Sequence, residues 1–248
     1  MNANVRYHNH IASELQCYFV DSHVHLPRCH GVDAAYRDHP CLVPAVEGED
    51  NRFLIQRYGR ASIALGYHPR MACHAIDWES MADLLGSGGF AAIGECGLDK
   101  RLGNLPRQME VFERQICLAR DFDLPLIIHC VGHQDVLLAL HRHYRFRGVL
   151  HAFHWRHLPP PLLTGDLFFG YCCRLPLTAR AQTLFASLPL DRILVETDGD
   201  EHTGARWSDL IEAYGRLARM KGLPLPEAAR QISDNYHRLL AAEAGFLR

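Results

Sequence analysis

Histidine and carboxylate side chains end several apolar segments of this 248-residue sequence, which contains 17 histidines. The first such segment, DSHVHL, holds His23 and His25. Because successive residues of a strand alternate faces, we expect both imidazoles on one side and Val24 on the other. An H-x-H pair alone is a weak signal for metal binding, since a histidine in a strand can equally be a hydrogen-bonded core residue.

Four further polar residues occupy the same kind of position. They are Glu95 in AIGEC, His129 in PLIIH, His151 in GVLHAF and Asp198 in ILVETD. Any one of them could be a satisfied core residue or a helix cap, but burying all six groups is costly unless they are paired, hydrogen-bonded or coordinated. Four histidines and two carboxylates exceed the needs of one tetrahedral zinc and suit two divalent ions that share a carboxylate and a water. Such a centre lowers the pKa of the shared water, so the pattern predicts a hydrolase.

The elements that must position these groups alternate between short apolar segments and amphipathic segments of helical length, a pattern typical of βαβ units. Strands are predicted at 18–26, 41–46, 62–67, 91–96, 124–130, 148–153, 167–172 and 193–198. The clearest helix spans 106–122, with Met109, Phe112, Ile116 and Ala119 on one face. Asp77 is expected to cap a helix around 81–85, and Pro226 to open the last helix.

Eight strands alternating with helices over this length predict the α/β class and a single (β/α)8 TIM barrel. We assign the barrel to residues 18–248 and an N-terminal extension to 1–17, in which His8 and His10 fit a solvated tail better than a metal site. A doubly wound open sheet is the alternative, but no Gly-rich phosphate loop follows the first predicted strand.

The charge balance of 26 basic and 28 acidic residues gives a net charge of −2, so any polyanion must be met by local cations. None of the nine cysteines forms a C-x-x-C pair, which favours a reducing, cytoplasmic compartment. No segment has the apolar length of a transmembrane helix or the pattern of a signal peptide, so we expect no membrane association. No stable protein partner can be predicted from the sequence.

Several motifs in this order and spacing resemble the TatD family of metal-dependent deoxyribonucleases, within the amidohydrolase-like TIM barrels. They are DSHVH, GYHP at 66–69, GECGLD at 94–99, a helix with Gln115, Leu118 and Ala119 before LPLIIH, then HAF at 151–153 and ILVETD. The similarity extends from about residue 19 to residue 235.

The resemblance implies a role for each matching residue. His23, His25 and Asp198 would hold one metal, His129 and His151 the second, and Glu95 would bridge the two. Asp198 would also orient or deprotonate the attacking water, so Asp198 and Glu95 are the implied catalytic residues, and His68 would face the substrate phosphate. The implied cofactors are two divalent ions such as Mg, Mn or Zn, and the implied activity is hydrolysis of DNA phosphodiesters, often from a 3′ end, by a hydroxide bridging the metals.

Three departures from the family pattern fall in loops after the site strands. Cys130 and Val131 replace a serine and an arginine, Trp155 replaces a glycine, and Gly199 is followed by two acidic residues. Trp155 is expected to narrow the site mouth or to offer a stacking surface for a base. Cations that could replace the missing arginine, unless they are surface charges, are Lys100, Arg101, Arg107, Arg156 and Arg174, and histidines that could line the mouth are His133, His154, His157 and His202.

Two alternative functions stay open at this stage. The same metal centre could hydrolyse a small ester, lactone or amide, as in other amidohydrolase-like barrels, because the arginine is missing and the rim is acidic. A barrel that acts as a scaffold and keeps its metals for stability is the third possibility, and the intact set of ligand positions argues against it.

Overall fold

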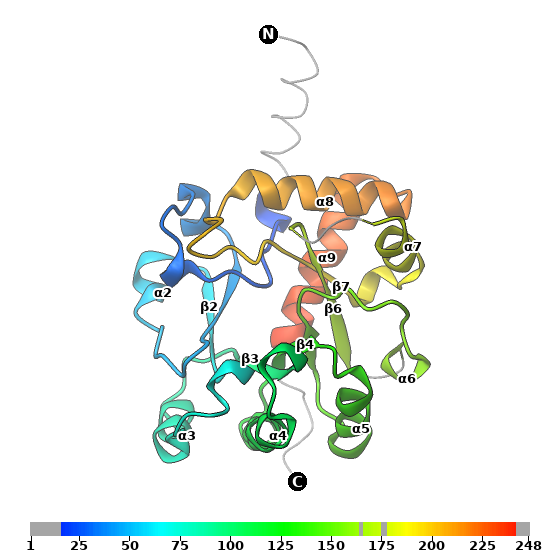
Figure 1. Ribbon diagram of the computed structural model, residues 1–248. Coiled ribbons are helices and arrows are strands. Elements are labelled where there is room, and N and C mark those ends of the chain that lie inside the picture. Colours follow the sequence, from blue (N-terminus) through cyan, green and yellow to red (C-terminus); the bar gives the residue numbers. More distant parts are fainter. Residues whose placement is uncertain (1–15, 164–165, 175–177, 242–248) are drawn as a thin grey trace.

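The computed structural model describes residues 16–163, 166–174 and 178–241 (Figure 1). Its sheet has seven parallel strands that pair in the order of the sequence. They are β1 (Cys41–Pro44), β2 (Ala61–Leu65), β3 (Ala92–Asp99), β4 (Leu126–Val131), β5 (Gly148–Leu150), β6 (Leu167–Cys172) and β7 (Ile193–Glu196). Parallel strands in sequence order with helical crossovers form the curved wall of a barrel.

The segment predicted as the first strand, 18–26, is not a regular strand, and this part of the prediction was wrong. It makes single bridges to both edges of the sheet: Val24 N–H donates to Leu42 O in β1 (3.1 Å), and Ser22 N–H donates to Val195 O in β7 (3.0 Å). The carboxylate of Asp21 accepts the backbone N–H of His23 (3.2 Å), and such local bonds compete with a strand ladder. The irregular segment still occupies the eighth position, so the α/β class and the barrel architecture are confirmed.

Four of the eight predicted strands end earlier in the structure than in the sequence pattern, and two, β3 and β4, end later. β5 ends at Leu150, one residue before His151, and β7 ends at Glu196, two residues before Asp198. A shift of register in the pairing of β3 with β4 falls between Ile93 and Cys96, next to Glu95. Irregularities of this kind turn a side chain away from the pleat, and here they lie beside the expected ligands.

Helices cover the outside of the sheet (Figure 1). They are α2 (Leu54–Arg57), α3 (Trp78–Gly86), α4 (Leu105–Asp121), α5 (Gln134–Tyr144), α6 (Pro160–Leu163), α7 (Ala179–Ser187), α8 (Trp207–Lys221) and α9 (Leu225–Leu240). Short 3₁₀ turns are η1 (Gln16–Tyr18), η2 (Leu26–Arg28), η3 (Ala34–Arg37), η4 (Pro69–Met71), η5 (Lys100–Leu102) and η6 (Leu190–Arg192).

The helix predictions agree with these elements. In α4, Phe112, Ile116 and Ala119 are buried as expected, while Met109 is only partly covered. Asp77 caps α3 by accepting the N–H of Ser80 (3.0 Å), and Pro226 lies in the first turn of α9. None of the helices that the structure describes is long and apolar enough to span a bilayer.

Two buried glutamines of α4 fix the ends of two strands. The amide of Gln115 accepts from Tyr67 N–H (2.8 Å) and donates to Tyr67 O (3.0 Å). Gln108 makes the same pair of bonds with Asp99, at 2.7 and 2.9 Å. A side-chain amide can satisfy both backbone groups of one residue only if the helix and the strand end keep a fixed separation. The helix therefore positions the residues that follow β2 and the end of β3.

The described residues share one hydrophobic core, which includes strand residues such as Leu42 and Leu194 and helix residues such as Phe112 and Tyr214. We propose a single barrel domain over 18–248 after an extension at 1–17. Residues 1–15 of that extension, with His8 and His10, lie outside the described part of the chain.

Candidate metal centre

The six predicted ligands converge at the carboxyl ends of the strands, where barrel enzymes place their sites. They adjoin a cleft of about 240 Å³. Its walls are formed by His25, Arg28, Val46, His68, Arg70, Glu95, His129, His151, Asp198, Asp200, Glu201 and His202. His23 is fully buried beneath this cleft.

Glu95 lies between two sets of imidazoles and turns one carboxylate oxygen toward each set. Oε2 lies 3.6 Å from Nε2 of both His23 and His25. Oε1 lies 3.0 Å from Nδ1 of His129 and 3.2 Å from Nε2 of His151. The side chain is 5% exposed, so these nitrogens, rather than water, surround the carboxylate.

The first set of donors also contains Asp198. The Nε2 atoms of His23 and His25 are 3.1 Å apart, as expected for side chains on one face, and Oδ1 of Asp198 lies 3.6 and 3.5 Å from them. Ligand atoms about 2.1 Å from one ion in a tetrahedral arrangement lie about 3.4 Å apart, so the observed separations fit a cation. Nitrogen and carboxylate donors of this kind accept zinc, manganese, iron or magnesium.

In the second set, a carboxylate lies near the ring nitrogen of each histidine that faces away from Glu95. Oδ2 of Asp99 lies 2.9 Å from Nε2 of His129, and Oε1 of Glu196 lies 3.4 Å from Nδ1 of His151. A carboxylate on the far nitrogen of a histidine fixes the ring and raises its basicity toward a metal. Sequence reasoning assigned no role to Asp99 or Glu196, although both lie in the quoted motifs GECGLD and ILVETD.

The surrounding charges keep the carboxylates of the cluster ionised. Burial alone would raise the pKa of Glu95, but the charge of His151 and hydrogen bonds from His129, His151 and His23 hold that pKa well below its ordinary value. Burial also opposes ionisation of Asp198, and the hydrogen bond with His25 and the charge of His151 outweigh it and lower its pKa. Ionised carboxylates beside imidazole nitrogens form a donor set that attracts divalent cations.

His68 is arranged as a hydrogen-bond donor rather than as a ligand. Burial lowers the pKa of its imidazole to about 4, so the ring is neutral at neutral pH. Its Nδ1 accepts the N–H of Arg70 (3.1 Å), which leaves the proton on Nε2, 3.7 Å from Oε1 of Glu95. His68, Glu95 and His129 are close enough to hold an ion, but a protonated nitrogen has no lone pair to offer a metal.

Asp21 supports the first set of histidines from the interior of the barrel. Its Oδ1 accepts the N–H groups of His23 (3.2 Å) and Thr197 (3.1 Å), and its Oδ2 accepts the hydroxyls of Tyr36 (2.7 Å) and Thr197 (2.6 Å). Burial raises the pKa of this carboxyl to about 6, although each of the four hydrogen bonds lowers it. The network ties the irregular segment to the residues between β7 and Asp198.

The structure changes the interpretation of the loop departures. Trp155 is 6% exposed and packs against Phe153, with ring centroids 5.5 Å apart. Its ring therefore offers no stacking surface at the mouth, and that prediction was wrong. The acidic rim is present, because Asp200 and Glu201 line the cleft. Of the four histidines that could line the mouth, His202 is among the cleft residues, whereas His133, His154 and His157 are not.

The arginines that line the cleft are not the cations that the sequence suggested. Arg101 pairs with Asp99, Arg107 pairs with Glu110, and Arg174 donates to the carbonyls of the loop after β7. Lys100 and Arg156 also do not line the cleft. Instead, Arg28 and Arg70 do, and sequence reasoning missed both. The available signal was their position, three residues after His25 and two after His68.

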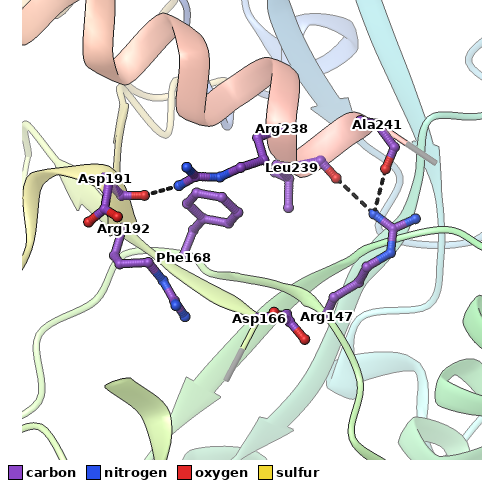
Figure 2. Close-up of a pocket in the computed structure, with 8 residues that line it drawn as sticks. All are labelled: Arg147, Asp166, Phe168, Asp191, Arg192, Arg238, Leu239 and Ala241. Atoms are coloured by element: carbon purple, nitrogen blue, oxygen red, sulfur yellow. Dashed lines mark hydrogen bonds between the residues drawn. The ribbon is translucent and has the colours of Figure 1, made fainter. Parts of the chain in front are cut away.

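A second cavity, of about 410 Å³, lies at the opposite end of the barrel, beside the starts of β5, β6 and β7 (Figure 2). Its arginines are engaged by backbone carbonyls: Arg147 donates to Leu239 O (3.0 Å) and Ala241 O (3.1 Å), and Arg238 donates to Asp191 O. These bonds join the end of α9 to the sheet, which is a structural function.

We expect Asp99→Ala to weaken metal binding by roughly 10- to 100-fold, because His129 loses the carboxylate that fixes its ring. Titration calorimetry with Mn²⁺ measures the change. Asp99→Asn keeps an acceptor for His129 and should recover most of the affinity, whereas Asp121→Ala, at an exposed carboxylate of α4, should have no effect. Equal affinities for the wild type and Asp99→Ala would contradict this role.

Comparisons with known proteins agree with the barrel fold and identify its family. A family model described as TatD related DNase matches residues 20–241. The uncharacterized metal-dependent hydrolase YcfH of Escherichia coli is 27% identical over 267 residues, covering 93% of this chain and 98% of YcfH. The 3'-5' ssDNA/RNA exonuclease TatD of Edwardsiella piscicida is 34% identical over 145 residues, 54% of this chain and 55% of that protein. The crystal structure of YjjV, a TatD homologue from Escherichia coli, matches with a TM-score of 0.75 at 25% identity, covering 91% of this chain and 98% of YjjV.

Proposed function

The chain belongs to the TatD-related DNase family of metal-dependent hydrolases, and from this premise we propose that it cleaves phosphodiester bonds of DNA with two divalent ions. One observation carries the proposal: the two oxygens of Glu95 face separate sets of imidazole nitrogens, as a carboxylate shared by two cations would. We assign His23, His25 and Asp198 to one ion and His129 and His151 to the other.

The chemistry of such ions and the position of the side chains fit hydrolysis. When bound by these residues, two divalent ions would lower the pKa of the attacking water and offset the negative charge of the phosphodiester. Asp198 can accept a proton from that water, since its side chain is 34% exposed toward the cleft while its carboxylate stays ionised. The Nε2–H of His68 can donate to a phosphate oxygen as water attacks phosphorus and the P–O ester bond breaks.

A panel of substrates tests the proposal. Protein reconstituted with Mg²⁺, Mn²⁺ or Zn²⁺ should degrade 5′-labelled single-stranded DNA, progressively from the 3′ end, and should lose the activity in EDTA. Asp198→Asn should lower kcat by about 10³ or more, because it removes a ligand and the proton acceptor together. Activity of Asp198→Asn equal to wild type would assign the cleavage to another site. RNA in the same panel establishes the preference between the two nucleic acids.

A second function with the same metal centre is hydrolysis of a small ester, lactone or amide. The observation that favours it is the acidic rim of Asp200 and Glu201 on a cleft of about 240 Å³. Ester or lactone turnover without nuclease activity in the same panel would select this alternative. Nuclease activity that falls steeply with salt would select the phosphodiesterase.

A further inference from the structure

Two arginines line one side of the cleft, next to the proposed ligands. Arg28 is the last residue of η2, and Arg70 lies in η4, directly after His68 and Pro69. Their side chains are 27% and 37% exposed, so both guanidinium groups can reach a ligand in the cleft. Neither arginine donates to a backbone carbonyl in the hydrogen bonds found among the described residues, unlike Arg107 and Arg174.

The two carboxylates that pair with these arginines, Glu49 and Glu47, differ in how firmly neighbouring groups hold them. Glu49 is fixed, because its Oε2 accepts the N–H groups of Val46 (3.0 Å) and Glu47 (2.8 Å), and its Oε1 lies 3.2 Å from Nη2 of Arg28. Glu47 is 46% exposed, and its Oε1 is shared by Nη2 of Arg28 (3.4 Å) and Nη2 of Arg70. Two guanidinium groups thus converge on one oxygen of a side chain that can move into solvent.

The cleft carries charges of both signs. Arg28 and Arg70, from η2 and η4, line it together with Asp200 and Glu201, from the loop after β7. A nucleic-acid strand that leaves the metal centre is repelled by the two carboxylates and attracted by the two guanidinium groups. Since the net charge of the chain is −2, this local pair is the cationic surface that the cleft offers to a polyanion.

We propose that Arg28 and Arg70 form a clamp for the phosphate that flanks the scissile phosphate, and that Glu47 occupies the clamp until substrate displaces it. This inference rests on the proposed phosphodiesterase function, because a flanking phosphate exists only in a nucleic-acid substrate. The bidentate geometry of guanidinium suits a phosphate oxygen as well as it suits a carboxylate. The clamp supplies a cation in place of the arginine that the family pattern has at the position of Val131.

Two substrates separate the clamp from the metal chemistry. An oligodeoxynucleotide carries flanking phosphates, whereas bis(p-nitrophenyl) phosphate has a single phosphodiester. We expect Arg28→Gln and Arg70→Gln each to raise KM for the oligonucleotide about tenfold with kcat within about twofold, and to leave bis(p-nitrophenyl) phosphate hydrolysis unchanged. Glu47→Gln should lower KM for the oligonucleotide. Arg120→Gln, at an exposed arginine of α4 that pairs with its neighbour Asp121, is the matched control.

A binding measurement tests the clamp independently of catalysis. Fluorescence anisotropy of a labelled single strand in EDTA should show weaker binding for the double variant Arg28→Gln/Arg70→Gln, with the slope of log K against log [salt] reduced by about 0.7 per arginine. Unchanged binding and unchanged KM would overturn the clamp, as would equal losses on both substrates. A wild type that cleaves only bis(p-nitrophenyl) phosphate would refute the nuclease function, whereas cleavage of the strand with KM and binding unaffected by either variant would refute the clamp alone.

Discussion

Replacing Glu95 by Gln should abolish nuclease activity, with a loss of about 10³ or more in kcat/KM, and should reduce the bound divalent ions below two per chain. The wild-type side chain presents one oxygen to His23 and His25 and the other to His129 and His151. Glutamine keeps one oxygen and turns an NH₂ donor toward the other set, where no cation can be held. Metal analysis by mass spectrometry after reconstitution measures the ions, and the oligonucleotide assay measures the activity.

The control for this substitution is Glu110→Gln, at a carboxylate that is 67% exposed and pairs with Arg107 on α4. It should keep both ions and full activity. Circular dichroism establishes that Glu95→Gln retains the fold, because loss of the barrel would also remove the metals. A folded Glu95→Gln protein with two ions and wild-type cleavage would refute the role of Glu95 as the shared ligand.

Much of the site could be predicted because it depends on short-range geometry. The two-residue period of an extended segment brings His23 and His25 to one side, and this holds although the segment is not a regular strand. The carboxyl ends of parallel strands meet at one end of a barrel, so Glu95, His129 and His151 come together from segments far apart in the sequence. Helix α4 could be predicted because its buried face repeats with the period of a helix.

The features that could not be predicted depend on neighbours that are distant in the sequence. Trp155 occupies a loop position in the sequence pattern, where an exposed side chain is expected. Only the structure shows that its ring is buried against Phe153. Arg28 and Arg70 are separated by 41 intervening positions, and only the structure shows that both contact Glu47. The bonds of Asp21 to Thr197, which help to hold the irregular segment in place of the first predicted strand, likewise need a partner from the far end of the chain.

Asp21→Ala should be the most destabilising of the substitutions considered, by about 3–5 kcal/mol in the free energy of unfolding. The change removes the acceptor of four hydrogen bonds and leaves the N–H groups of His23 and Thr197 and the hydroxyls of Tyr36 and Thr197 buried without it. Each buried donor without a partner costs about 1–3 kcal/mol. Urea unfolding of the metal-free protein measures the effect, and removing the metal prevents its binding energy from masking the loss.

Two variants serve as controls for Asp21→Ala. Asp33→Ala removes a carboxylate that also accepts a backbone N–H, from Ala35 at the start of η3, but does so at the surface and should cost about 1 kcal/mol or less. Asp21→Asn keeps an oxygen that accepts the two N–H groups, and its NH₂ group can donate to the hydroxyl oxygens of Tyr36 and Thr197. It should therefore cost less than Asp21→Ala. If Asp21→Ala were no less stable than Asp33→Ala, the segment 18–26 would be held between β1 and β7 by its backbone bonds and by the packing of Phe19 on Tyr214, and the Asp21 network would be dispensable.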